Sequence, residues 1–108
     1  MEPQLIQLHN PDRQRLNVQQ RSPHLIRFEY LGALALALGA RSHTSLLLHP
    51  GRSEAVLLVP MIKRPRTRIA VGAAESNRRW LYAWHGGHWH STDDVVGAAL
   101  RLIDIITR

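Results

Sequence analysis

The stretch WLYAWHGGHWHS, residues 80–91, decides the fold of this chain. Two glycines, Gly86 and Gly87, separate two segments rich in aromatic residues, which are typical of β-strands. Glycine readily adopts the positive φ angles that a two-residue hairpin turn requires. The stretch therefore predicts a β-hairpin with strands at 80–85 and 88–91.

A two-residue turn also predicts which side chains share a face. It would pair His85 with His88, Trp84 with Trp89 and Ala83 with His90, and side chains alternate along each strand. One face would then carry Trp80, Tyr82, Trp84 and Trp89, and the other Leu81, Ala83, His85, His88 and His90. We expect the aromatic face to be the core face of the sheet. The alternative is a platform on which bases or a ligand stack.

The three histidines of the predicted hairpin raise the question of a metal site. His85, His88 and His90 on one face could ligate Zn or Ni, with a coordination position left open. The other interpretation is that they are solvent-facing side chains near a turn. No acidic residue is an obvious partner for them, so we expect no cofactor and keep the metal site as the less favoured alternative.

Upstream of the hairpin, the sequence predicts further strands at 44–48, 55–62 and 68–72. Turn residues separate them at 49–53, and a basic turn follows at 63–66. Together with the hairpin, these segments make an antiparallel sheet of four or five strands.

Helices are predicted on both sides of the strands. Ser22 followed by Pro23 is a typical helix start, and the helix runs to Leu38 with Gly39 after it. A second helix is predicted at 94–107, capped by Ser91 or Thr92. The fold class is therefore α+β, in the order helix, sheet, helix. We divide the chain into a flexible N-terminal arm at 1–21 and one α+β domain at 22–108.

The formal net charge of +6 comes from 13 Arg and one Lys against eight acidic residues. This preference for Arg suggests a GC-rich genome, which weakens the charge as a sign of nucleic-acid binding. The basic turn, with Arg78 and Arg79 expected nearby, could still contact phosphates. The candidate residues are Lys63, Arg64, Arg66, Arg68, Arg78 and Arg79. The alternative is a solvated turn.

Several function classes are disfavoured. The chain has no cysteine, which excludes disulfides, thiolate metal sites and cysteine nucleophiles. The N-terminus lacks the pattern of a secretory signal. The longest apolar run, residues 31–40, has about half of the roughly 20 residues that a membrane-spanning helix needs. We therefore expect a cytoplasmic protein that does not bind membranes.

The motif at 80–99 resembles one in small uncharacterised actinobacterial proteins. The shared features are the aromatic strand from Trp80 to Trp84, the glycine turn, Trp89, and a closing helix that begins near Asp93 and Asp94. The resemblance implies a helix–sheet–helix layout over residues 24–108. It implies no activity.

We interpret the chain as a non-enzymatic accessory or regulatory module that binds protein, as a homodimer. Both predicted helices have more apolar surface than one sheet face requires, which is typical of an interface. The candidate contacts are Leu34, Leu36, Leu100 and Ile105. The alternatives are a nucleic-acid-associated protein that uses the basic residues and a metal-binding protein that uses the three histidines.

Overall fold

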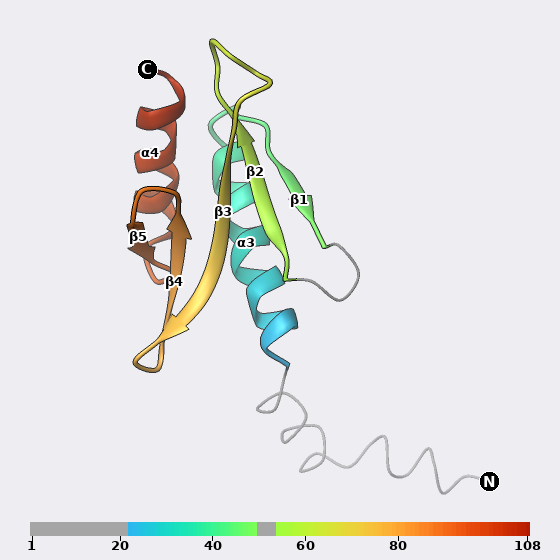
Figure 1. Cartoon of the computed structure of the whole chain (residues 1–108), viewed down its shortest axis with the longest axis vertical. Coiled ribbons are helices and arrows are strands. Elements are labelled where there is room, and N and C mark those ends of the chain that lie inside the picture. Colours follow the sequence, from blue (N-terminus) through green and yellow to red (C-terminus); the bar gives the residue numbers. More distant parts are fainter. Residues whose placement is uncertain (1–21, 50–53) are drawn as a thin grey trace, which may run out of the picture.

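The computed structural model describes residues 22–49 and 54–108, and it confirms the predicted α+β fold (Figure 1). A helix comes first, five antiparallel strands form one sheet, and a second helix closes the chain. The elements are α3 (Pro23–Gly39), β1 (Leu46–Leu48), β2 (Val56–Pro60), β3 (Arg68–Ser76), β4 (Arg79–Trp84), β5 (His88–Ser91) and α4 (Val95–Ile106). The predicted arm at 1–21 lies outside the described residues.

Side-chain caps fix where the two helices begin. Ser22 caps α3 as predicted, since its hydroxyl accepts a hydrogen bond from the Leu25 N–H at 3.3 Å. The predicted cap of α4 was wrong. Asp94 caps this helix, and its carboxylate accepts from the Gly97 N–H at 3.0 Å. Thr92 is instead buried and donates its hydroxyl to the Trp80 carbonyl at 3.0 Å.

The strands form a meander in which each pairs with the next along the chain. β3 is the longest, with nine residues, and it extends beyond the end of β4. Its pairing with β4 begins at Val71, opposite Trp84, so the segment from Arg68 to Ala70 pairs with β2 alone.

The predicted hairpin exists, but the predicted pairing was wrong by one residue. Trp84 lies opposite His88, and Ala83 lies opposite Trp89. The turn therefore contains His85 as well as the two glycines, which have φ angles of 94° and 76°. A shift of one residue moves every side chain of the second strand to the other face. Trp89 thus lies on the face opposite Trp84 and is 59% exposed.

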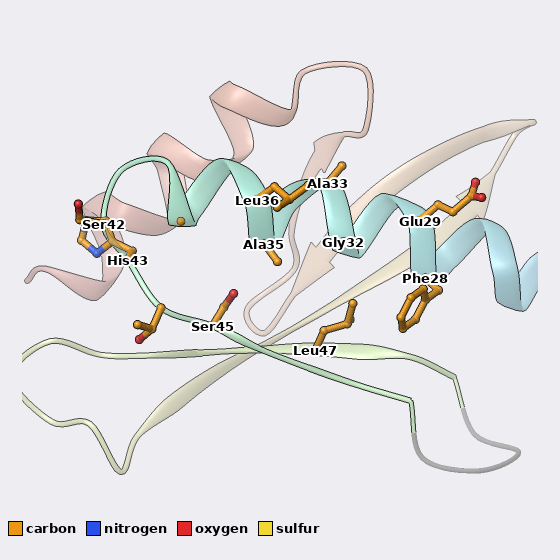
Figure 2. A pocket seen from close by; sticks show the side chains of 12 residues that line it. Phe28, Glu29, Gly32, Ala33, Ala35, Leu36, Ser42, His43, Ser45 and Leu47 are labelled. Carbon is orange, nitrogen blue, oxygen red and sulfur yellow. The ribbon is translucent and has the colours of Figure 1, made fainter.

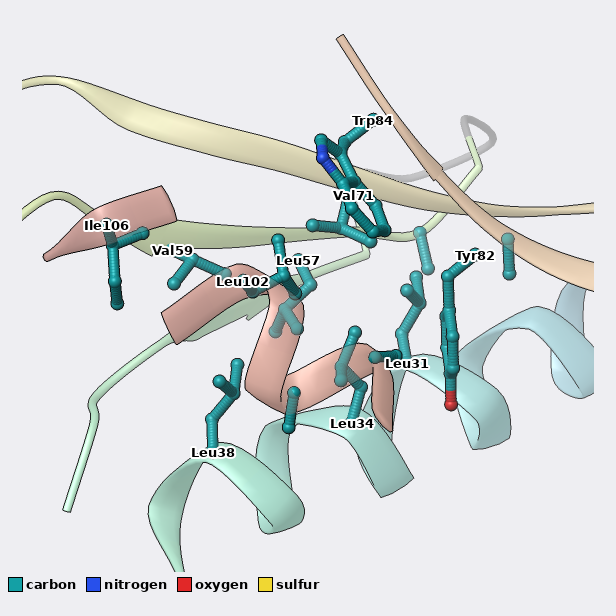
Figure 3. Close-up of a cluster of buried hydrophobic side chains, with 14 residues drawn as sticks. Leu31, Leu34, Leu38, Leu57, Val59, Val71, Tyr82, Trp84, Leu102 and Ile106 are labelled. Carbon is teal, nitrogen blue, oxygen red and sulfur yellow. The ribbon is translucent and has the colours of Figure 1, made fainter. Parts of the chain in front are cut away.

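Both helices pack on one face of the sheet, which we call the inner face. Figure 3 shows the core between them, where side chains of β2, β3 and β4 meet those of α3 and α4. Tyr82 is completely buried here, and its hydroxyl donates to the Tyr30 carbonyl at 2.7 Å. Burial, together with the nearby Tyr30, raises the pKa of Tyr82 to about 12. The predicted core role is confirmed for Trp80, Tyr82 and Trp84.

The opposite face of the sheet, which we call the outer face, is covered by no described element. Its side chains follow from the strand register, because paired residues point the same way. Its apolar side chains are Leu46, Leu48, Val56, Leu58, Pro60, Ala70, Gly72, Ala74, Leu81, Ala83 and Trp89. Polar side chains join this face at the ends of the strands, at Arg68, Ser76, Arg79 and Ser91.

Candidate functional site

On the outer face, two groups of large side chains flank a central group of small ones. Leucines of β1 and β2 form the first, since Leu46 pairs with Leu58. Small residues occupy the centre, where Gly72 pairs with Ala83. Trp89 on β5 forms the second beside Ala83. Leu46 is 51% exposed and Trp89 is 59% exposed, so large apolar side chains flank a centre of small residues.

Charged side chains lie at the ends of the outer face and not in its centre. Arg68 begins β3, and Arg79 lies opposite Ser76 at the other end of that strand. The eight steps along β3 from Arg68 to Ser76 span roughly 26 Å at the usual rise of a strand. The middle of the face is therefore neutral, with one arginine at each end.

This arrangement separates the predicted nucleic-acid residues into two groups. Lys63, Arg64, Arg66 and Arg68 lie in or next to the β2–β3 loop, whereas Arg78 and Arg79 lie at the β3–β4 turn (Figure 1). The two groups are at opposite ends of β3, which corrects the expectation that they are neighbours. Together they do not form one continuous basic patch.

The three predicted metal ligands have different surroundings. His88 stacks on Trp84 with ring centroids 5.9 Å apart, whereas His85 lies in the turn. His90 lies 2.9 Å from the Asp94 carboxylate and 3.3 Å from a guanidinium nitrogen of Arg101. The described part of the chain contains no group of three or more His, Cys, Asp or Glu side chains that could hold a metal ion. The structure therefore does not support the metal site.

Both ring nitrogens of His90 are occupied by the protein itself. Arg101 can only donate, so Nδ1 of His90 accepts and Nε2 carries the proton that Asp94 accepts. The hydrogen bond from His90, and a second one from the Gly97 N–H, lower the pKa of Asp94 below its ordinary 3.8. Both ring nitrogens of His90 thus have partners within the protein.

A cleft lies on the inner side of the sheet, where β3 extends past β4. Its volume is about 550 Å³, and it lies between the edge of β3, the β4–β5 turn and the last turn of α4. Met61, Ile69 and Ile105 give it apolar walls, and Trp84 lies at its inner end. Its charged lining residues are Arg68, Arg101, Asp104 and Arg108. Sequence reasoning did not find this cleft, because its walls come from four separate segments.

The four predicted interface residues do not form one surface. Leu34 is completely buried in the core, so it cannot contact a partner, and this corrects its assignment. Leu36 lines an open trough of about 910 Å³ between α3 and β1, into which Phe28 and Leu47 also point (Figure 2). Ile105 lines the cleft, and Leu100 is exposed on α4.

Sequence reasoning also missed the outer face. The signal was present in β2, where the segment VLLVP is apolar at every position. A strand with one solvated face normally alternates apolar and polar residues, and a continuous apolar run indicates burial on both faces. The sheet, and not only the two helices, therefore has surplus apolar surface.

Comparisons of the chain with known protein families, curated proteins and solved structures give no match. The resemblance to actinobacterial proteins therefore stays a prediction. In the part of the chain that the structure describes, no helix has the length and apolar character needed to cross a membrane.

Proposed function

We propose that this protein is a non-enzymatic protein-binding module and that it forms a homodimer through the outer face of its sheet. One observation supports this proposal above all. The outer face presents apolar side chains from all five strands, and no described element covers it. Large exposed apolar patches are rare on monomers and are typical of interaction sites.

The arrangement of large and small side chains on the outer face favours a second copy of the chain as the binding partner. In a two-fold dimer each face meets the same face of its partner, so raised parts must fit into low parts. The small residues Gly72 and Ala83 leave room for the partner's Leu58 or Trp89, and the reverse contact follows by symmetry. Two sheets packed in this way commonly lie with their strands about 30° apart.

Area and charge agree with a modest affinity. Five strands at a spacing of about 4.8 Å, with a mean length of about 18 Å, cover roughly 430 Å² in projection. The accessible area is larger because side chains project from this plane, which places the interface at the small end of specific contacts. The uncharged centre avoids burying an unpaired arginine, which would be costly. We therefore expect a dissociation constant on the order of micromolar.

Sedimentation equilibrium of the full chain, over a range of concentrations, tests the proposal. The wild type should form a dimer, and Ala74→Lys should be a monomer because it puts a charge at an exposed position of the central strand, two residues from Gly72. Leu36→Lys is the matched control. It adds the same charge on α3, where Leu36 is 77% exposed, and should leave the dimer intact. A monomeric wild type, or a dimer broken by Leu36→Lys and not by Ala74→Lys, contradicts the proposal.

Salt separates this proposal from nucleic-acid binding. Raising NaCl from about 0.05 M to about 0.5 M screens the arginines at the ends of two facing sheets, so the dimer should be strengthened or unchanged. Binding to phosphates weakens steeply over the same range. A single-stranded oligonucleotide that binds more tightly to Ala74→Lys than to the wild type, with no dimer formed by either protein, would favour the nucleic-acid alternative.

A further inference from the structure

Trp84, which lines the cleft between β3, the β4–β5 turn and α4, has a buried hydrogen-bond donor that no described residue accepts. Trp84 is only 7% exposed, and its indole N–H has no hydrogen-bond partner within residues 22–49 and 54–108. Figure 3 shows this nitrogen on the edge of the ring that faces away from Tyr82. A buried donor without an acceptor costs about 1–3 kcal/mol. An acceptor from a ligand would remove this cost.

Arginine side chains lie beside the Trp84 ring and in the lining of the cleft. The Arg101 guanidinium carbon lies 5.2 Å from the centre of the Trp84 ring, and Arg101 also donates to the Trp89 carbonyl at 2.7 Å. Its position is therefore fixed by the fold. Arg108 reaches the cleft from the end of α4, where it pairs with Asp104 at 2.9 Å. Asp104 is the one acidic residue in the lining, so the cationic groups outnumber it.

The rest of the cleft suits a flat apolar group. Met61, Ile69 and Ile105 provide its apolar walls, and its volume of about 550 Å³ lies within the range of small-molecule sites. Because β4 ends opposite Val71, no strand among the described residues fills the space beside residues 68–70 of β3. The cleft is therefore built into the sheet by the unequal lengths of β3 and β4.

We propose that this cleft binds an aromatic carboxylate. A carboxylate oxygen accepts the Trp84 indole N–H, the Arg101 and Arg108 guanidinium groups balance the charge, and the ring lies against the apolar walls. The groups proposed to hold the carboxylate, Trp84, Arg101 and Arg108, lie on the inner side of the sheet, whereas the proposed dimer uses its outer face. Arg68 and Ala70, at one end of the outer face, also border the cleft.

The probe is 1-naphthoate, added to the ¹⁵N-labelled full chain and followed by NMR. The indole N–H resonance of Trp84, identified by its loss in Trp84→Phe, should move downfield and saturate at sub-millimolar ligand. The uncharged analogue 1-naphthylmethanol should bind at least about tenfold more weakly, because hydrogen bonds to charged groups are the stronger ones. No saturable shift of this resonance, or equal binding of the two probes, overturns the proposal.

Two exposed arginines provide a matched pair of variants. Arg108→Gln removes a charge from the cleft and frees the Asp104 carboxylate, and should weaken naphthoate binding about threefold to tenfold. Arg79→Gln removes the same charge at the other end of β3 and should change the affinity less than twofold. Ile105→Trp should abolish binding by filling the cleft. If the two arginine variants weaken naphthoate binding equally, the effect is due to the net charge of the protein, which contradicts the site.

Discussion

The two faces of the sheet are both apolar, but only one of them is used within the protomer. On the inner face, Leu57, Val59 and Val71 are completely buried under the helices. On the outer face, their neighbours Leu58 and Ala70 have no described element above them. Apolar composition alone therefore does not show whether a residue stabilises the protomer or an interface. The position of the helices makes that distinction.

The sharpest way to test this difference is to truncate two adjacent leucines of β2. Leu57→Ala removes side-chain atoms from the core and leaves a cavity, so unfolding should cost about 2–5 kcal/mol less. Leu58→Ala makes the same chemical change on the outer face, where the side chain is half-buried. It should lower the free energy of unfolding by less than about 1.5 kcal/mol. Urea denaturation, at protein concentrations well below the dissociation constant of the dimer, measures both effects.

In an assay of dimerisation, the larger effect should come from Leu58→Ala and not from Leu57→Ala. Leu58→Ala should weaken the dimer, whereas Leu57→Ala should not, provided that it is measured where it remains folded. If both variants lose equal stability as dilute monomers, the outer face is covered within the protomer and the contrast between the faces disappears.

The architecture could be predicted from the sequence because its signals are local. The cap at Ser22, the end of α3 at Gly39 and the aromatic alternation from Trp80 to Trp84 each depend on a few neighbouring residues. The pairing of β5 is different. Both HWHS and its partner strand carry large side chains on either face, so the hydrophobic pattern does not select one register. The two glycines fit a two-residue turn as well as the three-residue turn that forms.

The candidate sites could be predicted less well, because they depend on contacts between distant segments. Leu34 and Leu36 both lie in a helix pattern that is apolar on all sides, yet only Leu34 is buried in the core. The cleft depends on where β4 stops relative to β3, and on Arg101 reaching Trp84 from another element. No window of sequence contains both partners of such a contact.

Two glycines extend the comparison with smaller effects. A Cβ on Gly97 would overlap the Asp94 carboxylate and lie 2.8 Å from His90 Nε2, so Gly97→Ala breaks the cap of α4. We expect a loss of about 1–2 kcal/mol, as for other lost caps. A Cβ on Gly72 meets nothing within 4 Å on the outer face, so Gly72→Ala should be neutral or stabilise by up to about 1 kcal/mol.

Thermal denaturation of dilute monomers compares these two glycine variants directly. Although both variants add one methyl group, the change in stability should have opposite signs in the two proteins, or at least differ clearly between them. A Gly72→Ala protein that is as destabilised as Gly97→Ala would show that the outer face is closely packed within the protomer.

The smallest expected effect lies at the β5 edge, where the inner face becomes polar. Hydrogen bonds from His90 and Gly97 lower the pKa of Asp94 below 3.8, so the charged carboxylate is favoured in the folded state. Its contribution to stability is therefore present above the unfolded pKa and is lost as the pH falls through the folded pKa.

Asp94→Asn keeps a side chain that caps helices well and removes only the charge. The wild type should be slightly more stable than this variant at pH 6, and the difference should vanish well below pH 3.8, when both are followed by thermal denaturation. Since the wild-type carboxylate is exposed, the difference should also shrink in high salt. A difference that persists unchanged in acid would mean that Asp94 acts through its shape as a cap and not through its charge.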